Sequence, residues 1–232
     1  MRWRPGRRAL AEFIRHPLLD RIGVPHGFGV IDAAPPAGLL RVRQVHGIAV
    51  AIVDEEGVPS HDEADAVVSC QTQRPVGVMT ADCVPILAAA RDGSAVAAIH
   101  AGWRGLGAGV VEAGISALRV QCGGVHADLV AVIGPHIGAS CYEVDAPVLD
   151  TLRARFGEAV DDASEPTRPG HRRLALGDLV ALALGRAGVR EGSVAMLAGA
   201  CTSCDARRFH SYRRDGEHAG RLVHHISARA GR

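Results

Sequence analysis

Lysine is absent from this chain of 232 residues, so all 26 cationic residues are arginine. The formal net charge is only +1, which gives no electrostatic case for a nucleic-acid or anionic membrane partner. No apolar stretch reaches transmembrane length, and none of signal-peptide length follows the basic start "MRWRPGRRALAEFIRHP". We therefore expect a cytoplasmic protein with reduced thiols and a small-molecule substrate.

Cysteine pairs with metal-site spacing are also scarce. Cys201 and Cys204 form a lone C-x-x-C, and Cys70, Cys122 and Cys141 supply no second pair at suitable spacing. We expect Cys201 and Cys204 to be dispensable for metal binding and for activity. The chain has 12 histidines but no His-x-His, which argues against the multinuclear copper centre of a true laccase.

The patterning predicts a single domain over residues 1–232, with an α/β (α+β) fold, a layered sandwich around a mixed β-sheet. Short Val/Ile/Ala runs predict strands, and longer stretches with helical spacing predict helices. The expected strands are Ile48–Val53, Ala66–Ser69, Val76–Thr80, Val84–Ala89, Ala95–His100 and Leu129–Ile133. The expected helices are Leu106–Val120, Val148–Phe156 and Leu179–Ala187.

The stretch "TADCVPILAAARDGSAVAAIHAGWRG" predicts a β-hairpin, because two apolar runs flank the reversal signal Asp92-Gly93. A turn over Arg91–Ser94 sets His100 opposite Pro85. Cys83 lies two positions beyond Pro85, on the same face of the sheet as His100. Diagonal neighbours of this kind are roughly 7–8 Å apart at Cα, so the thiol and the imidazole can converge.

A thiol beside an imidazole allows three interpretations. The pair is a buried cysteine next to a satisfied histidine, or Cys83 is a nucleophile with His100 as its base, or the two share a metal ion. The glycine-rich bend "HAGWRG" after His100 favours chemistry over packing. A metal needs a third ligand, and His46 beside Gly47 offers the best context; three protein ligands leave a fourth position open, as in catalytic zinc sites.

Several motifs occur in the order seen in one family. The segments "QVHG" (44–47), "TADCVPIL" (80–87), "HAGWRG" (100–105), "IGPHIGASCYEV" (133–144) and "FHSYRRDGEHAGR" (209–221) resemble the YfiH-type family. That family has been called the laccase-domain or polyphenol-oxidase family, and later purine nucleoside phosphorylase. The resemblance extends from about residue 25 to the C-terminus.

The resemblance implies a mixed α/β sandwich related to cysteine-hydrolase-like toxins. It also implies one zinc ion bound by His46, Cys83 and His100, a site at which copper could substitute adventitiously. The implied activities are phosphorolysis of purine nucleosides (adenosine, inosine and methylthioadenosine) and deamination of adenosine. The implied partners are therefore a purine nucleoside and phosphate.

Other candidate residues complete this hypothesis. Asp82, next to the ligand Cys83, is the candidate for proton transfer. Arg104 on the "GWRG" bend is expected to orient phosphate. Adjacent arginines grip phosphate well, so Arg213 and Arg214 of "SYRRDG" are further substrate-binding candidates, together with Gln44.

One departure from the family pattern concerns the stretch "HGFGVIDAAPPAG" (26–38). Ile31 stands where an arginine is usual in the family. Poor use of phosphate is the expected consequence, unless Arg213, Arg214 or a nearby arginine such as Arg41 or Arg43 reaches the site instead. Two other functions remain open. The first is a hydrolase that edits peptidoglycan precursors, with a Cys/His pair or a zinc ion cleaving an amide. The second is a non-enzymatic binding protein braced by zinc, in which a protein side chain closes the fourth zinc position.

Overall fold

A computed structural model describes residues 11–72, 74–124 and 127–229. Its centre is a six-stranded mixed sheet in the order β11-β7-β5-β6-β3-β2. Antiparallel pairing runs from β7 through β5 and β6 to β3, whereas the outer strands β2 and β11 pair in parallel with their neighbours. The strands are β2 (Val50–Ile52), β3 (Ala66–Ser69), β5 (Val84–Ala90), β6 (Val96–Ala101), β7 (Leu129–Ile133) and β11 (Val194–Met196).

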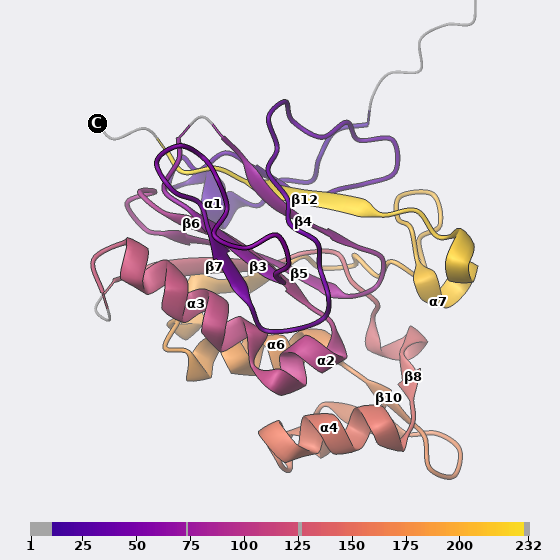
Figure 1. Ribbon diagram of the computed structural model, residues 1–232. Helices are drawn as coiled ribbons and strands as arrows, with labels where there is room; N and C mark the ends of the chain where they lie inside the picture. The colour runs from indigo at the N-terminus through magenta and orange to yellow at the C-terminus, as the bar shows by residue number, and fades with distance from the viewer. Residues whose placement is uncertain (1–10, 73, 125–126, 230–232) are drawn as a thin grey trace, which may run out of the picture.

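The central strands read as continuous apolar runs because both faces of the sheet are covered. On β5, Ile86 and Ala88 face a core shared with the helices, whereas Leu87 and Ala89 face a second core. Adjacent residues of a strand point to opposite faces, so this alternation divides one run between two cores. The result is a sandwich of three layers, shown in Figure 1.

Helices form one outer layer, and a small sheet forms the other. On the helical side lie α3 (Val110–Gln121) and α6 (Leu176–Arg186), whose apolar residues pack on the sheet. On the opposite side lies the sheet β1-β12-β4, with β1 (His26–Gly27), β4 (Val76–Thr80) and β12 (Leu222–Ile226). The remaining helices are α1 (Pro17–Asp20), α2 (Trp103–Ala108), α4 (Ala146–Phe156), α5 (Ala159–Asp162) and α7 (Tyr212–Asp215).

A second small sheet lies beside α4, at one end of the molecule (Figure 1). Its strands are β8 (Glu143–Val144), β9 (Ser164–Pro166) and β10 (Arg172–Leu174), in the order β8-β10-β9. Short 3-10 turns cover Ala139–Cys141, Glu191–Ser193 and Gly216–His218. The predicted layered sandwich with a mixed sheet is confirmed.

The predicted hairpin has the expected register, with Pro85 paired to His100 and Ala90 bonded to Ala95 across the turn. The single helix predicted over Leu106–Val120 is wrong. The chain forms α2 and α3 instead, because Gly109 adopts φ +106° between them. A left-handed residue cannot continue a helix, and glycine makes that conformation accessible.

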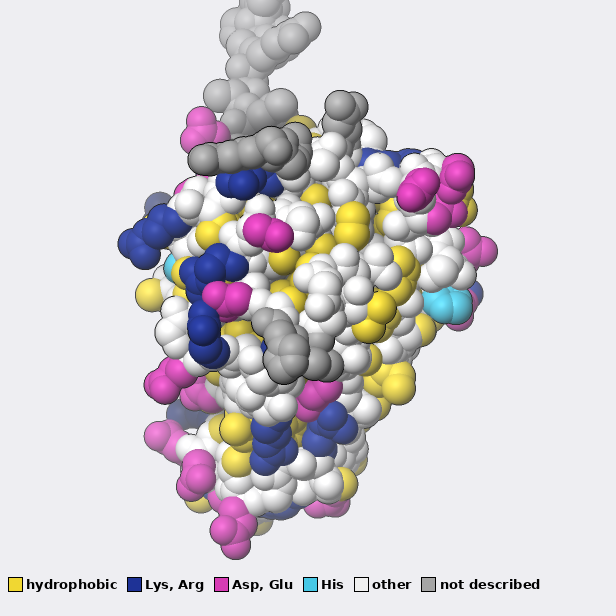
Figure 2. All heavy atoms as spheres, turned by 90° about the vertical axis from the view of Figure 1, so that its left-hand side faces the viewer, with side chains coloured by type: hydrophobic (Ala, Val, Ile, Leu, Met, Phe, Trp, Pro, Cys, Tyr) yellow, Lys and Arg dark blue, Asp and Glu magenta, His cyan; other side chains and the backbone are white. Residues whose placement is uncertain are grey.

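Charges of both signs lie on the face of the molecule shown in Figure 2. On the face shown in Figure 2, arginine and acidic side chains are interspersed with small apolar areas. None of the helices in the described ranges is long and apolar enough to span a bilayer. The expectation about the chain start falls mostly on residues 1–10, outside the described residues.

Candidate metal centre and cavity

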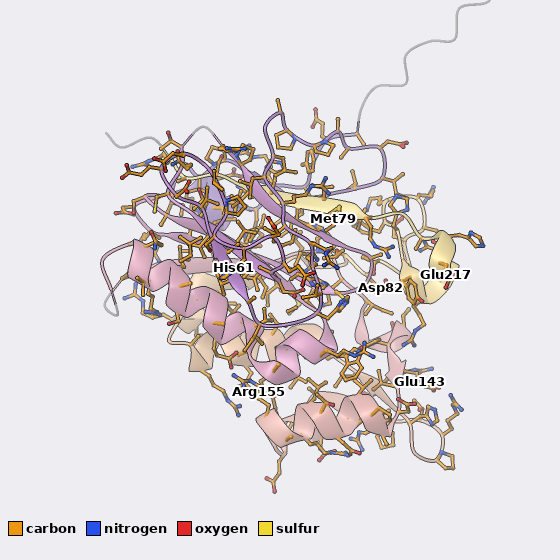
Figure 3. The ribbon with its side chains drawn as sticks, viewed as in Figure 1. His61, Met79, Asp82, Glu143, Arg155 and Glu217 are labelled. Atoms are coloured by element: carbon orange, nitrogen blue, oxygen red, sulfur yellow. The ribbon has the colours of Figure 1, made fainter. Side chains whose placement is uncertain are left out.

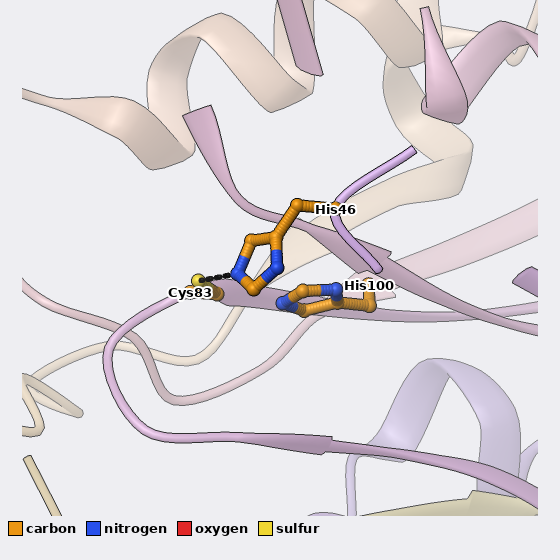
Figure 4. A group of neighbouring side chains, drawn as sticks. All are labelled: His46, Cys83 and His100. Atoms are coloured by element: carbon orange, nitrogen blue, oxygen red, sulfur yellow. Dashed lines mark hydrogen bonds between the residues drawn. The ribbon is translucent and has the colours of Figure 1, made fainter. Parts of the chain in front are cut away.

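Cys83 and His100 meet at the open end of the β5–β6 hairpin, as the register requires. Cys83 directly precedes β5, and His100 lies near the end of β6. His46, from the loop before β2, approaches both. The ligand atoms of these three residues all lie within 4.8 Å of one another, and Cys83 Sγ is 3.9 Å from His46 Nε2 (Figure 4).

His46 is held in a strained backbone conformation, with φ +60°. The Asp65 carboxylate stabilises that loop by accepting hydrogen bonds from three successive backbone N–H groups. The distances are 3.2 Å from Val45, 3.0 Å from His46 and 2.7 Å from Gly47. The buried carboxylate thus sets the direction in which the His46 ring points.

Asp65 also orients the second histidine, because its Oδ1 lies 2.8 Å from His100 Nδ1. The other ring nitrogen, Nε2, is then left for Cys83 or a metal, which is the usual arrangement of a metal-binding histidine and its carboxylate partner. Burial opposes ionisation of His100, but hydrogen bonds with Asp65 and Cys83 raise its pKa to about 9. Burial also opposes the Cys83 thiolate, yet hydrogen bonds to His100 and His46 lower its pKa to about 6.

Gly102 leaves room for the cluster. A Cβ at this position would lie 2.9 Å from His46 Cδ2 and 3.0 Å from Cys83 Sγ. Any side chain here would therefore push against two of the three metal-ligand candidates. This close approach explains why glycine occupies position 102 of the "HAGWRG" motif.

The cluster faces a cavity of about 940 Å³. Its walls come from the His46 loop, the end of β4, the start of α2, the β8 region and α7. Met79, Asp82 and Glu143, labelled in Figure 3, mark three parts of this wall. Aromatic and cationic side chains are prominent in the lining, and they include Trp103, Arg104, Tyr142, His171, Arg213 and Arg221.

Asp82 lies in the cavity wall, but its carboxylate is fully engaged. Oδ1 accepts a hydrogen bond of 2.6 Å from the Thr202 hydroxyl. Oδ2 accepts one of 3.0 Å from the Ser211 hydroxyl and one of 2.6 Å from the Arg213 N–H. Asp82 therefore joins the loop that carries Cys83 to the start of α7.

The remaining predicted residues divide into two groups. Gln44 and Arg104 both line the cavity, but the Gln44 amide is paired at both ends with the Met79 backbone, at 2.8 and 2.7 Å. Arg104 stacks on the Trp103 ring at 4.2 Å, and no ion pair engages it within the described residues. Its guanidinium is therefore the more available of the two groups.

The two adjacent arginines differ in placement. Arg213 lines the cavity, and its guanidinium lies 5.2 Å from the centre of the Tyr142 ring. Arg214 is not part of the lining. Its guanidinium is bound by Asp215 and by the carbonyl oxygens of Thr202 and Phe209, so its contacts are internal to the loop.

The structure corrects the expectation for Ile31. This residue is half-buried and packs against a small cluster of Ala200, Phe209 and Leu222, and it does not line the cavity. Its backbone N–H bonds to the Arg208 carbonyl at 2.8 Å. The lack of an arginine at position 31 therefore gives no reason to expect poor use of phosphate.

The C-x-x-C pair is less isolated in the fold than its spacing indicates, while the dispensability of Cys201 and Cys204 stays a prediction. Cys141 lies beside the C-x-x-C pair, with its Sγ 3.2 Å from Cys204 Sγ. The Sγ atoms of Cys141, Cys201 and Cys204 lie within 4.8 Å of one another. Sequence spacing could not reveal this, because the partner is about 60 residues away in the chain.

Sequence reasoning missed two residues of the main site. Asp65 directly precedes β3, but its role depends on pairing between β3 and β6, which the residues alone do not specify. Tyr142 follows the "ASC" turn and lines the cavity. Burial raises the pKa of Tyr142, so its phenol keeps its proton at neutral pH.

The geometry describes a mixed α/β protein in which three residues able to hold a metal ion lie at a cavity. Residues 30–229 match the model of the multi-copper polyphenol oxidoreductase laccase family. The chain belongs to this family. Within the described residues, the two groups able to hold a metal contain three ligands each, and neither is a cluster of histidines alone.

Named relatives connect the family to nucleosides. The chain is 39% identical over 180 residues to a purine nucleoside phosphorylase of Xylella fastidiosa, with 75% of this chain and 66% of the relative covered. It is 40% identical over 171 residues to purine nucleoside phosphorylase PA4543 of Pseudomonas aeruginosa, with 74% and 66% covered. The chain thus spans slightly less than two thirds of the length of these relatives.

Solved structures share the fold. Bacillus licheniformis YfiH, described as a hypothetical protein, superposes with a TM-score of 0.76 at 29% identity, covering 83% of this chain and 74% of that one. YlmD from Geobacillus stearothermophilus gives a TM-score of 0.85 at 24% identity, covering 97% and 98%. The six-stranded sheet with its small sheets is therefore the fold of YfiH- and YlmD-type proteins.

Proposed function

We propose that this protein is a zinc-dependent purine nucleoside phosphorylase. The observation that carries the proposal is a three-ligand site at the floor of a cavity of nucleoside size, in a chain whose relatives are named purine nucleoside phosphorylases. Small-molecule sites of this kind are concave, with aromatic walls and a few polar groups.

The residues present fit zinc. Two imidazoles and one thiolate are ligands that zinc prefers, and three protein ligands leave one position open. Asp65 fixes His100 so that Nε2 faces the cluster, and Cys83 favours the thiolate form that a metal requires. A zinc ion held by His46, Cys83 and His100 would supply a Lewis acid at the cavity floor.

In phosphorolysis, a phosphate oxygen forms a bond to the ribose C1′, the bond from C1′ to the purine nitrogen breaks, and the departing purine takes up a proton. Arg104 is our candidate for binding phosphate, because its guanidinium lines the cavity without an acidic partner among the described residues. Arg213 contributes positive charge to the same cavity. Two guanidinium groups offer phosphate the charge-assisted hydrogen bonds that it binds best.

The aromatic residues suit the purine. Trp103 and Tyr142 both line the cavity, and each carries an arginine near its ring. The half-buried Tyr142 phenol remains protonated and can donate a hydrogen bond to a ring nitrogen of the base. Asp82 holds α7 and the Cys83 loop in place, so we assign it to positioning instead of proton transfer.

Adenosine deamination is our second candidate for the same site. The observation that favours it is the His/Cys ligand set with an open position, a pattern shared with zinc deaminases, in which water attacks the purine ring. Deamination consumes water and needs no phosphate. Omitting phosphate from the assay therefore separates the two activities, because phosphorolysis stops and deamination continues.

The test is product identification with adenosine, inosine and methylthioadenosine, each with and without phosphate. We expect free base and the matching sugar 1-phosphate only when phosphate is present: ribose 1-phosphate from adenosine and inosine, and 5-methylthioribose 1-phosphate from methylthioadenosine. We expect inosine from adenosine in either condition. Cys83→Ala should lose the zinc ion held by His46, Cys83 and His100 together with both activities, whereas Cys70→Ala, at an exposed cysteine away from the site, should keep them. Turnover by fully metal-free protein, abolished when Cys83 is alkylated, would favour the cysteine-nucleophile hydrolase instead.

A further inference from the structure

Three cysteine side chains outside the main site form a second cluster, defined here as the thiol cluster of Cys141, Cys201 and Cys204. Cys141 belongs to the 3-10 turn before β8, and the other two lie in the loop before α7. We propose that the thiol cluster binds a second metal ion, a soft thiophilic cation of the Zn²⁺ or Cu⁺ class.

The donor set selects this chemistry. Thiolates favour Zn²⁺ and Cu⁺ over hard cations such as Mg²⁺ and Ca²⁺, which prefer oxygen. Zinc–sulfur bonds of about 2.3 Å in tetrahedral geometry place two sulfurs roughly 3.8 Å apart. The Sγ atoms here lie within 4.8 Å of one another, and those of Cys141 and Cys204 are 3.2 Å apart. An ion can thus be bound with small side-chain rotations.

Backbone contacts bring the two loops together before any ion is bound. The Thr202 N–H donates to the His136 carbonyl at 3.0 Å, and the His136 N–H donates to the Ala200 carbonyl at 3.3 Å. The Gly138 N–H points at Cys201 Sγ at 3.2 Å. A backbone N–H aimed at sulfur stabilises a thiolate, which is the form that binds metal.

The cluster is reachable from solvent, since the Cys204 side chain is exposed. All three cysteines are free of disulfides, and none belongs to the main site. Within the described residues, no fourth His, Cys, Asp or Glu joins the group. We therefore expect the protein to supply three ligands. A tetrahedral Zn²⁺ would take a fourth ligand from solution, whereas a trigonal Cu⁺ would need none.

The thiol cluster adjoins the wall of the cavity. Thr202, between the two cysteines of the C-x-x-C, donates the hydrogen bond to Asp82. Tyr142, which follows Cys141, lines the cavity, and Arg213 donates to the Cys141 carbonyl at 3.4 Å. An ion bound here would link two loops that position the far wall.

Metal stoichiometry tests the proposal. Chelator-stripped, reduced protein is dialysed against Zn²⁺ alone and, in a separate anaerobic series, against Cu⁺ alone. With at least one of these ions, wild type should bind two equivalents per chain, whereas Cys204→Ser and Cys83→Ser should each bind one. Cys70→Ser, an exposed cysteine outside both clusters, is the matched control and should still bind two.

X-ray absorption on the metal in Cys83→Ser identifies its ligands, and we expect a shell dominated by sulfur. In the same background, the added ion should raise the Tm, and this shift should vanish in Cys83→Ser/Cys204→Ser. Equal stoichiometry in wild type and Cys204→Ser with both ions would overturn the proposal. So would a Cys141–Cys204 disulfide in protein purified under reducing conditions. None of these readouts depends on nucleoside turnover.

Discussion

Asp65 serves both histidines of the main site through one carboxylate. The carboxylate accepts hydrogen bonds from three backbone N–H groups of the His46 loop and is also hydrogen-bonded to His100 Nδ1. The residue touches neither the cavity nor a proposed substrate. Its importance follows from geometry, because two ligand candidates depend on the same buried acceptor.

We predict that Asp65→Asn lowers zinc affinity about 10- to 100-fold, as loss of a histidine's supporting carboxylate commonly does. Asparagine cannot satisfy all four donors, and its amide N–H₂ would face at least one of them. Competition with a chelator measures the affinity. Asp62→Asn, at an exposed position three residues away, should leave it unchanged.

Gly102→Ala tests the packing of the cluster directly. The added methyl group would lie 2.9 Å from His46 and 3.0 Å from Cys83, so we expect a marked loss of bound zinc. Gly185→Ala, whose Cβ would meet nothing within 4 Å, provides the control. Full zinc occupancy in a folded Gly102→Ala protein would contradict the described approach of these three residues.

Arg104 is the residue that we propose binds phosphate. Removing a charge-assisted hydrogen bond costs roughly 1.5–3 kcal/mol, which corresponds to about 10- to 150-fold in affinity. Arg104→Ala should therefore raise the KM for phosphate by that factor and leave adenosine deamination nearly unchanged. Ile31→Arg should have little effect on phosphate, because Ile31 does not line the cavity.

Among the structural elements, the short helix α7 depends on hydrogen bonds to one carboxylate, that of Asp82. It is a helix of four residues, too short to be stable alone, and Asp82 accepts hydrogen bonds at its start from Ser211 and Arg213. Through Thr202, the same carboxylate also holds the neighbouring loop.

We predict that Asp82→Asn speeds amide hydrogen exchange across residues 211–215 and lowers nucleoside affinity. An amide cannot accept all three hydrogen bonds, so the helix would detach more often. Asp145→Asn changes an exposed carboxylate of the same cavity that makes no such contacts, and it should not change exchange in α7. Bound zinc should stay at the wild-type level in both variants.

Elements that depend on local chemistry were predictable from the sequence. The Asp92-Gly93 reversal fixed the hairpin register, and this register alone brought Cys83 towards His100. The break at Gly109 was not predictable, because glycine is tolerated within helices and only tertiary contacts decide. The third ligand candidate, His46, was suggested by its context beside Gly47 and supported by the family resemblance. Spacing alone could not place it, since its approach depends on a loop that hydrogen-bonds to Asp65.

At the scale of the whole molecule, folding is linked to pH through His224. This residue is fully buried between the two sheets, and its ring nitrogens contact Thr80 Oγ1 at 2.9 Å and the Gly29 N–H at 3.2 Å. Burial lowers its pKa from 6.5 to about 3. Burial also lowers the pKa of the neighbouring His225 to about 4.

Both histidines are neutral in the folded state, so protonation favours the unfolded chain. The contribution of these two histidines to stability should be complete above pH 6.5 and should decline as pH falls from 6.5 towards 3. Each group contributes up to about a tenfold change in the unfolding constant per pH unit. His224→Gln should flatten this slope in urea unfolding, whereas exposed His61→Gln should not.

The thiol cluster shows what sequence spacing conceals at this scale. Cys141 and Cys204 are brought together by the tertiary fold, which places their two loops side by side, and not by any local motif. The same holds for the far wall, where Tyr142 and Arg213 meet from distant segments.

The order of functional residues along the chain has an evolutionary consequence. His46, Cys83 and His100, with their supports Asp65 and Gly102, all come from one continuous stretch of 44–102. Most of the opposite wall comes from residues 137–221, including the β8 region and α7. Substitutions, insertions or exchanged segments in the later part can alter which molecule fits while the reactive centre is inherited intact. Selection can therefore diversify substrate preference among such proteins without rebuilding the chemistry.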